Sequence, residues 1–328
     1  MKTVTPPVQL QPRTQPLKAG TRGAPLARQQ TATVLGLLRQ ACPAPEGTEI
    51  FEEHIIVTTG DAVLTKPLAE IGGKGLFAKE IHESLAAGRI DFAVHSLKDL
   101  ETGLPPGIVL ACTLPREDPR DVLILPPGRA PATPNDPLSA LPQGAVIGSA
   151  SVRRQAQLKH ARPDLRFTLL RGNVGTRLGK IEAGALDATL LAYAGLRRLG
   201  LADKASLVLE TEHMLPAACQ GIVGITARAA DTDLLELLAA IEDPTSKAVA
   251  TAERALLATL DGSCRTPIAG YAQRLDNGTL HLTGLVARHD GSFLLKRSVT
   301  GNTADAALMG RELGLSLKAD SPGDIFLP

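Results

Sequence analysis

Three side chains of different chemistry stand within four residues of one another: the hydroxyl of Ser96, the ammonium of Lys98 and the carboxylate of Asp99. They follow a mostly apolar stretch, residues 90–94, which predicts a buried strand. In an open α/β sheet, ligands bind just beyond the carboxyl ends of the strands, where a carboxylate can relay protons or stabilise a cation. An ordinary polar turn after a strand explains the same spacing equally well.

Arginines follow three further predicted strands. Residues 145–148, 167–170 and 186–192 are expected to be strands, and each leads through a loop into a helix. The side chains concerned are Arg153, Arg154, Arg171, Arg177 and Arg198, with Ser149 and Ser151 in the expected N-cap cluster of the first helix. Strand ends of this kind converge at one edge of a sheet, which favours a site for small anions. A solvated charged face is the simpler interpretation.

Two loops add further cationic side chains. Arg22 lies in a predicted turn, residues 19–25, just before a predicted helix at 25–39. Lys74 lies in a glycine-rich loop, residues 71–77, that opens another helix. Backbone N–H groups of such a loop can reach an anion, although the spacing is not that of a P-loop. The hinge of a mobile lid is the structural alternative, and for Arg22 it is a solvated surface position.

Composition limits the class of protein. The chain has 328 residues and a formal net charge of +1, which argues against a general nucleic-acid binder or a polybasic membrane protein. No run is apolar enough for a signal segment or a membrane span. The four scattered cysteines have no metal-ligand spacing and suggest reduced thiols. We therefore expect a cytoplasmic protein with no metal site.

The elements that position these side chains suggest three domains after a disordered tail, residues 1–17. Residues 88–94 resemble residues 184–190, and each stretch follows an amphipathic helix, which suggests two α/β domains of similar plan with a cleft between them. The predicted strand 222–227 returns the chain to the first domain. Three strands with hairpin turns at 276–278 and 289–291 lie between two helices near the C-terminus and predict a small α+β domain. The expected boundaries are 18–115 with 216–240, 116–215, and 241–328.

Cys264 stands in a Gly/Ser loop at the start of this last domain. A free cysteine is most often a small buried hydrophobe. A loop at the edge of a domain can also present a nucleophile, but no histidine flanks Cys264, so a Cys-His dyad has no support. Both interpretations stay open on the residues alone.

Several motifs, taken in order, resemble the hydroxymethylbilane synthase family, also called porphobilinogen deaminase. They are Gly20-Thr21-Arg22, Gly72-Gly73-Lys74-Gly75-Leu76-Phe77, His95-Ser96-Leu97-Lys98-Asp99, Arg116-Glu117-Asp118-Pro119-Arg120-Asp121, Ser151-Val152-Arg153-Arg154, Leu170-Arg171-Gly172-Asn173-Val174-Gly175-Thr176-Arg177, Ala194-Gly195-Leu196-Arg197-Arg198-Leu199-Gly200 and Gly262-Ser263-Cys264. The resemblance runs from about residue 18 into the C-terminal domain, and the run from Arg171 to Arg177 is its most specific part.

The resemblance implies a transferase of tetrapyrrole (haem) biosynthesis. It would join four porphobilinogen molecules head to tail, release four ammonia molecules and produce linear hydroxymethylbilane. The family builds on a dipyrromethane cofactor held by a thioether to a cysteine, and the matching position here is Cys264. The implied fold is α/β: two domains like those of periplasmic binding proteins flank a cleft, and a smaller α+β domain with a three-stranded antiparallel sheet follows. The family also implies a monomer that binds neither nucleic acid nor membrane.

The resemblance also assigns roles to residues. Asp99 matches the catalytic carboxylate, which would stabilise the cationic pyrrole and relay protons. Guanidinium groups suit the acetate and propionate of the substrate. The matching cofactor- and substrate-binding positions are Arg22, Lys74, Ser96, Lys98, Ser149, Ser151, Arg153, Arg154, Arg171, Gly172, Arg177, Arg198 and Gln220. The loop of Lys74 resembles the family's mobile lid, which would shield the reaction from water.

Some positions depart from the family. Ala24, Glu70, Ala150 and the pair Leu100-Glu101 replace residues that are common there, which removes possible hydrogen bonds to carboxylates. A non-enzymatic small-anion-binding protein of the two-domain binding-protein type is the alternative function. The absence of a secretion signal and the domain of Cys264 count against it, and a metal hydrolase has no ligand cluster to support it.

Overall fold

The structure is a computed structural model, and it describes residues 16–43, 48–62, 75–129, 133, 135–260 and 266–326. Lys74, Glu70, Cys264 and the first fifteen residues of the expected tail lie outside the described residues, while Leu17 already belongs to the first strand. The described residues up to 62, from 75 to 116 and from 222 to 247 form one compact unit, here unit 1. The others, from 117 to 221 and from 248 on, form unit 2. The predicted division into three domains and the predicted cleft stay predictions.

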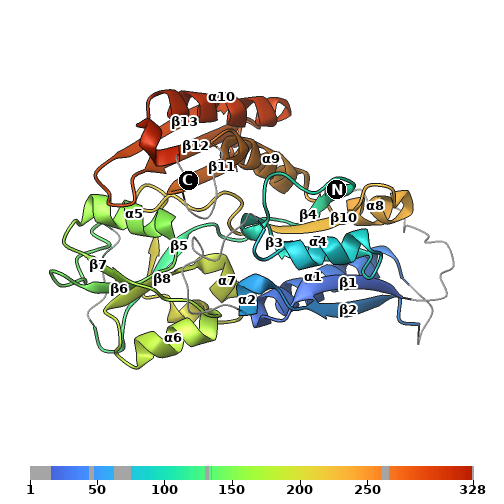
Figure 1. Cartoon of the computed structure of the whole chain (residues 1–328), viewed down its shortest axis with the longest axis horizontal. Coiled ribbons are helices and arrows are strands. Elements are labelled where there is room, and N and C mark those ends of the chain that lie inside the picture. The colour runs from blue at the N-terminus through green and yellow to red at the C-terminus, as the bar shows by residue number, and fades with distance from the viewer. Residues whose placement is uncertain are drawn as a thin grey trace. The chain divides into compact units, whose positions relative to one another are not determined.

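Unit 1 is built on a five-stranded sheet (Figure 1). Its strands, in the order in which they lie side by side, are β2 (Phe51–Ile56), β1 (Leu17–Arg22), β3 (Phe92–Ser96), β10 (Val223–Arg228) and β4 (Ile108–Thr113). Strand β1 runs parallel to β2 and β3, whereas β10 runs antiparallel to β3 and β4. The prediction that residues 222–227 return the chain to the first sheet is therefore confirmed.

Helices cover both faces of this sheet because its strands are apolar on both sides. The helices of unit 1 are α1 (Pro25–Ala41), α2 (Thr59–Ala62), α4 (Lys79–Ala86) and α8 (Thr232–Ala239). Phe92 and Val94 of β3 pack with α1 and α8 in one core, while Ala93 packs with α4 in another. This alternation is the period of two expected of a strand. Because both faces of β3 are covered, the strand can present polar groups only at its end, at Ser96.

One predicted turn is a strand. Residues 19–22 were expected to belong to a turn that ends at residue 25, yet they belong to β1. A Cβ on Gly20 would lie 2.3 Å from Cδ1 of Ile90. The glycine is therefore needed for close packing under the neighbouring chain, which is the usual meaning of a glycine inside a strand.

Unit 2 repeats the same plan. Its five-stranded sheet consists, in spatial order, of β7 (Arg166–Thr168), β6 (Val146–Gly148), β8 (Ala188–Ala192), β5 (Asp121–Ile124) and β9 (Leu207–Leu209). Here too the second strand, β6, runs parallel to both of its neighbours, and the fourth strand, β5, is antiparallel to its own. The helices are α5 (Val152–Ala161), α6 (Val174–Glu182) and α7 (Tyr193–Arg198), with a short turn η2 (Ala202–Lys204).

The weak sequence repeat corresponds to a repeated structure. Asp91 and Asp187 each precede the third strand of their sheet. The backbone N–H of Lys18 donates to Asp91 at 2.8 Å, and that of Val146 donates to Asp187 at 2.9 Å. An arginine pairs with each carboxylate, Arg228 in unit 1 and Arg129 in unit 2. The two aspartates therefore fasten equivalent strands in the two units.

Unit 2 also carries the predicted antiparallel sheet of three strands, β11 (Ile268–Arg274), β12 (Leu280–Ala287) and β13 (Leu294–Gly301). Figure 1 shows helix α10 (Ala306–Ala319) lying along this sheet, and α9 (Pro244–Thr259) packs beside α10. The short turns η3 (Thr303–Asp305) and η4 (Gly323–Phe326) complete this part. The expected α/β sheets and the expected C-terminal α+β layer are thus confirmed.

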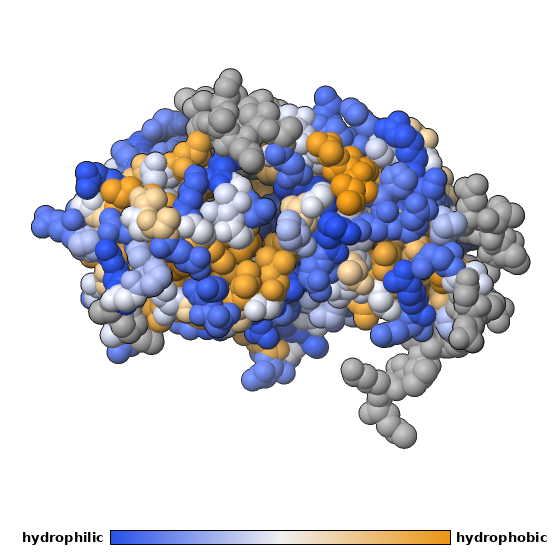
Figure 2. All heavy atoms as spheres, turned by 90° about the horizontal axis from the view of Figure 1, so that it is seen from below, coloured by the Kyte–Doolittle hydropathy of each residue, from blue (hydrophilic) through white to orange (hydrophobic). Residues whose placement is uncertain are grey.

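Among the described residues, no helix is both long enough and apolar enough to span a membrane. Figure 2 shows hydrophilic residues over much of the face that it displays, with apolar residues in separate groups between them. Scattered apolar residues of this kind are normal on a folded domain.

The packing of α10 on α9 leads to a stability prediction. A Cβ on Gly310 would lie 2.2 Å from the carbonyl oxygen of Ala252, and backbone cannot move aside as a flexible side chain can. We expect Gly310→Ala to destabilise the protein by about 1–3 kcal/mol through overpacking. Gly179→Ala, in helix α6 of the same unit with open space around it, should instead stabilise by roughly 0.5–1 kcal/mol. Urea unfolding followed by circular dichroism measures both; equal effects of the two substitutions would contradict the packing argument.

Candidate functional site

Asp99 lies on a single 3-10 turn, Leu97–Asp99, directly after β3. Leu97 is buried, and its N–H donates to the carbonyl of Ile222 at 2.9 Å, which ties the turn to the chain that enters β10. The N–H of Leu100 donates to the carbonyl of Leu97 and closes the turn. The side chain of Asp99 is 34% exposed. The strand and turn therefore hold a reachable carboxylate beyond the carboxyl end of a central strand.

Arg22 stands beside this carboxylate in unit 1. Its Nη1 is 3.7 Å from Oδ2 of Asp99. Its Nε donates to Oδ2 of Asp61 at 2.9 Å, and its Nη2 binds the other oxygen of Asp61. Thr58 donates a further hydrogen bond to Asp61, and the guanidinium lies 4.2 Å from the centre of the Phe77 ring. The arginine is therefore held in one orientation by a carboxylate and an aromatic face.

The charge state of Arg22 follows from these neighbours. Burial lowers the pKa of Arg22, but the hydrogen bonds and charges of Asp61 and Asp99 outweigh burial and raise the pKa above its ordinary value. The guanidinium stays charged. Its position between two carboxylates means that Asp61 carries the bidentate pairing, while Asp99 keeps only the longer contact and remains available to a ligand.

Ser96 and Gln30 complete the wall of a small cavity beside Asp99. The two side chains exchange hydrogen bonds of 2.9 and 3.1 Å, and Gln30 is only 2% exposed. Lys98 lies half-buried in the same turn. The residues that line the cavity are Arg22, Ala27, Gln30, Phe77, Val94, His95, Ser96 and Asp99.

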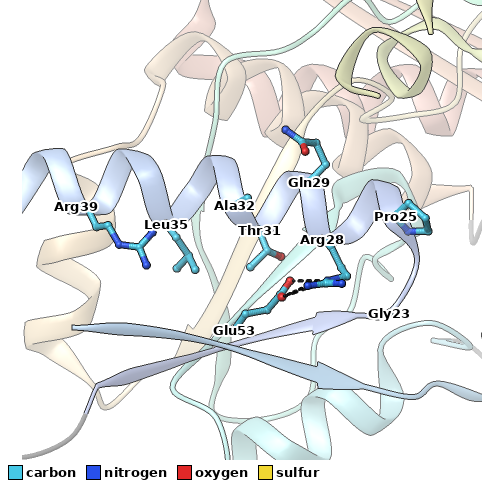
Figure 3. A pocket seen from close by; sticks show the side chains of 9 residues that line it. All are labelled: Gly23, Pro25, Arg28, Gln29, Thr31, Ala32, Leu35, Arg39 and Glu53. Carbon is cyan, nitrogen blue, oxygen red and sulfur yellow. Dashed lines mark hydrogen bonds and ion pairs between the residues drawn. The ribbon is translucent and has the colours of Figure 1, made fainter. Parts of the chain in front are cut away.

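A larger groove in unit 1 is not the site. It has a volume of about 490 Å³ and lies between α1 and the neighbouring strands (Figure 3). Figure 3 shows the guanidinium of Arg28 turned toward the carboxylate of Glu53, and their closest contact is 3.0 Å. None of the predicted site residues lines this groove. Its carboxylate, Glu53, pairs with Arg28, and its other charged side chain, Arg39, pairs with Glu49 outside the lining.

In unit 2, Arg153 and Arg154 share one buried carboxylate. Asp121, the first residue of β5, is fully buried. Nη2 of Arg153 lies 2.8 Å from one oxygen of Asp121, and Nη2 of Arg154 lies 2.7 Å from the other. Gln220 donates to the same carboxylate at 2.9 Å. Both arginines are therefore already paired inside the protein, which the strand-end pattern did not reveal.

Burial by itself would raise the pKa of Asp121. The two guanidinium charges, with hydrogen bonds from Arg154 and Gln220, outweigh burial and hold the pKa well below its usual range. Two cations and one anion leave this cluster with a net positive charge. Nε of Arg154 is buried and makes no hydrogen bond within the described residues. The cluster therefore keeps a net positive charge, while this Nε is inaccessible from outside.

The remaining predicted residues of unit 2 lie at the starts of helices. Ser151 caps α5 by accepting a hydrogen bond from the N–H of Arg154, and the hydroxyl of Ser149 accepts one from the N–H of Ser151. The N-cap role expected of this cluster is confirmed. Arg177 donates to the carbonyl of Gly172 at 2.9 Å, and Gly172 has a φ of 111°. Arg171 is buried immediately before them.

Arg198 behaves differently from the other arginines. Its Nη2 donates to the carbonyl of Gly221 at 2.7 Å, at the last residue of unit 2 before the chain passes into unit 1. Burial lowers the pKa of Arg198, and the charge of Glu117 only partly restores it. One guanidinium nitrogen of Arg198 therefore binds the backbone at the residue where the chain leaves unit 2.

The structure groups the described candidates by unit. Unit 1 holds Arg22, Ser96, Lys98 and Asp99, and unit 2 holds Ser149, Ser151, Arg153, Arg154, Arg171, Gly172, Arg177, Arg198 and Gln220. Sequence reasoning missed Asp61, Phe77, Gln30 and Asp121 as partners of these residues. The dense charge at 116–121 drew attention to the segment that contains Asp121. It did not show that Asp121 is buried, because a carboxylate in a charged run is usually exposed.

Solved structures with a similar fold are distant. The VFT2 domain of BvgS from Bordetella pertussis is 14% identical and has a TM-score of 0.41, with 72% of this chain and 90% of that chain covered. A putative sulfonate-binding protein SsuA from Methylobacillus flagellatus KT is 13% identical and has a TM-score of 0.37, with 73% and 67% covered. Scores this low carry no argument about the present chain.

Curated relatives are much closer. Porphobilinogen deaminase from Paracoccus denitrificans is 48% identical, with 95% of this chain and 96% of the relative covered. The enzyme from Alkaliphilus metalliredigens is 45% identical, with 92% of each chain covered. The chloroplastic one from Oryza sativa subsp. japonica is 44% identical, with 94% of this chain and 85% of the relative covered.

Two family models also match. Residues 17–236 match the model of the porphobilinogen deaminase dipyrromethane cofactor binding domain, and residues 247–319 match that of the porphobilinogen deaminase C-terminal domain. Together the two matches cover both five-stranded sheets and the three-stranded sheet. The chain therefore belongs to the porphobilinogen deaminase family.

Proposed function

We propose that this chain joins four porphobilinogen molecules head to tail into linear hydroxymethylbilane, with release of four ammonia molecules, for tetrapyrrole biosynthesis. Family membership supports this reaction. The observation that carries the proposal is the placement of Asp99: a reachable carboxylate beyond a central strand, 3.7 Å from a fixed guanidinium.

Asp99 would perform the proton transfers. Porphobilinogen loses ammonia and becomes an electron-poor cation, and a nearby carboxylate stabilises that charge as it develops. The same group can hand a proton to the departing amine and accept one later from the newly joined pyrrole. Arg22 supports this role because its bidentate bond to Asp61 prevents it from neutralising Asp99 fully.

The arginines of unit 2 would bind the carboxylates of the substrate and of the growing chain. Each porphobilinogen carries an acetate and a propionate, so a chain of several units is a polyanion. Planar guanidinium groups match carboxylates with two parallel hydrogen bonds. The net positive charge of the cluster around Asp121 supports this assignment.

The cofactor is a dipyrromethane, and its binding domain is the one that the family model matches over residues 17–236. When bound, it supplies the pyrrole carbon to which the first substrate is joined. Within unit 2, the guanidinium groups of the cationic cluster suit the carboxylates that such pyrroles carry. We propose Cys264, which lies outside the described residues, as the point of attachment.

The other cysteines support Cys264 by their burial. Cys42, Cys112 and Cys219 take part in no disulfide within the described residues, and all are buried. Burial raises the pKa of Cys112 to about 12, with Glu242 adding to the shift. A covered thiol cannot reach a cofactor from outside, so the burial of the three makes none of them suited to attachment.

We also propose that the chain works as a monomer in the cytoplasm, on the sequence features given above. The rice relative is described as chloroplastic, so membership of the family does not by itself decide the compartment.

The role of Asp99 is tested by removing its charge and keeping its shape. We expect Asp99→Asn to keep the covalent cofactor, seen as an intact mass two pyrrole units above the sequence mass, while turnover of porphobilinogen falls by roughly 100-fold or more. Asp203→Asn, an exposed aspartate of unit 2, serves as the control and should turn over normally. Turnover by Asp99→Asn within a few-fold of the parent would remove Asp99 from the reaction centre.

The attachment site is tested by counting thiols. After purification and denaturation, we expect iodoacetamide to modify three of the four cysteines, because the fourth, Cys264, is already a thioether. Peptide mass spectrometry should place the two pyrrole units on Cys264, and Cys264→Ser should have the bare sequence mass. Alkylation of all four cysteines after incubation with porphobilinogen would contradict both the cofactor and the proposed reaction.

The buried cluster of unit 2 is tested through Asp121→Asn. Removing the charge leaves two buried guanidiniums without their anion, so we expect a loss of about 3–5 kcal/mol in the free energy of unfolding. The carboxylate contributes its stability above its unfolded pKa of about 4 and loses it only as the pH falls through its much lower folded pKa. The loss should therefore be equal at about pH 5 and about pH 7 in urea titrations.

The control for Asp121 is Glu182→Gln, which breaks an exposed ion pair with Lys204 in the same unit. Exposed pairs contribute little, so its unfolding midpoint should hardly move. A loss at Asp121 no larger than that at Glu182 would show that the cluster is not the structural centre inferred here.

A further inference from the structure

Beneath the turn of Asp99 lies a buried pair that the proposed reaction does not use. His82 of helix α4 is 4% exposed, and Glu101 stands two residues after Asp99 with its side chain 16% exposed. Nδ1 of His82 lies 3.2 Å from Oε1 of Glu101. The pair thus connects the segment that carries Asp99 to a helix that lies earlier in the chain.

The surroundings of His82 give it one clear polar partner. Its second ring nitrogen, Nε2, is buried and makes no hydrogen bond within the part of the chain that the structure describes. The ring of His95, on β3, lies 6.1 Å away, and its own Nε2 is bound to the hydroxyl of Thr226 on β10 at 2.9 Å. A histidine whose Nδ1 faces a carboxylate keeps its proton on Nδ1.

A leucine at position 82 would be expected to give at least as much stability as the buried histidine. The neighbouring core positions of α4 are Ile81 and Leu85, and burying a polar pair seldom adds stability over apolar packing. The best-attested benefit of such a pair is that it specifies one alignment of two elements. The pair of His82 and Glu101 therefore suggests that α4 and the segment after Asp99 have to be held in one fixed position relative to each other.

Glu101 also touches the start of the segment that leads into α4. A Cβ on Gly75 would lie 3.0 Å from Oε1 of Glu101, and Gly75 has a φ of 79°. The carbonyl of Gly75 accepts hydrogen bonds from the N–H groups of Ala78 and Lys79, which begin the helix. Phe77, which stacks on Arg22, lies between these residues. One carboxylate thus lies against the backbone beside Phe77 and two residues from Asp99.

We propose that His82 and Glu101 are positioning residues that hold Asp99 at its distance from the Arg22–Phe77 stack. The proposal rests on the proposed role of Asp99, and neither residue is suggested to touch the substrate.

The charge state of Glu101 is consistent with this role. Burial raises the pKa of Glu101, but the hydrogen bond and charge of His82, with a smaller effect of His95, outweigh burial and leave the pKa below its ordinary value. The carboxylate is ionised at neutral pH and accepts the proton of Nδ1.

Nitrogen-15 NMR of the full chain labelled at histidine tests the pair without reference to activity. We expect His82 to carry its proton on Nδ1, whereas exposed histidines such as His213 and His289 should show the Nε2-protonated form common in water. In Glu101→Ala the His82 signals should move toward those of the exposed histidines. An Nε2-protonated His82 in the parent protein, or unchanged signals in Glu101→Ala, would overturn the pair.

Kinetics test the positioning role. We expect Glu101→Ala and His82→Ala each to lower kcat by about tenfold, with KM for porphobilinogen within about twofold and the cofactor mass retained. Glu101→Gln should recover most of the rate, because its amide oxygen still accepts from Nδ1. The double variant should be no slower than either single variant, since the two act as one unit. Glu83→Gln, on the exposed face of α4, is the matched control.

The outcomes separate the two proposals. An additive double variant, an effect on KM alone, or an unchanged kcat would overturn the positioning role while leaving the reaction intact. Failure of the parent protein to produce hydroxymethylbilane would overturn the proposed function, and the NMR result on His82 would still decide whether the pair exists.

Discussion

A fully buried aspartate that must be paired constrains much of unit 2. Asp121 opens the antiparallel strand of the sheet, and two arginines at the start of α5 reach it together with Gln220. Water cannot solvate these charges, so the helix start, the strand and the segment near residue 220 have to meet in one arrangement. In the proposed function, the same cluster would also supply positive charge to the carboxylates of a ligand.

The two five-stranded sheets share one plan, and each takes its antiparallel strand from chain that has just come from the other unit. Strand β5 follows the first passage near residue 117, and β10 follows the return near residue 222. The first passage and the return meet in unit 2, where the N–H of Glu117 donates to the carbonyl of Gly221. Each unit therefore has a set of polar side chains after one of its parallel strands, β3 in unit 1 and β6 in unit 2. One set is organised around Asp99 and the other around Asp121.

Much of the fold could be predicted from periodicity and turn chemistry. The hairpin turns of the last sheet, the cap at Ser151 and the return of the chain through β10 were all anticipated. The errors have a physical cause. Gly20 was placed in a turn, although its lack of a side chain serves close packing against Ile90. The prediction that Arg153 and Arg154 bind ligand carboxylates missed their partner inside the protein, because the strand-end pattern does not show that Asp121 binds both.

The order of motifs along the chain determined the family, the reaction class and the residue types at the site, because these depend on chemistry that each short segment carries by itself. Only the tertiary structure decided which groups meet: Asp61 with Arg22, Asp121 with Arg153 and Arg154, and Glu101 with His82. These partners stand 19 to 39 residues apart along the chain. Their contacts depend on strand order, register and helix placement, and local periodicity carries no information about any of the three.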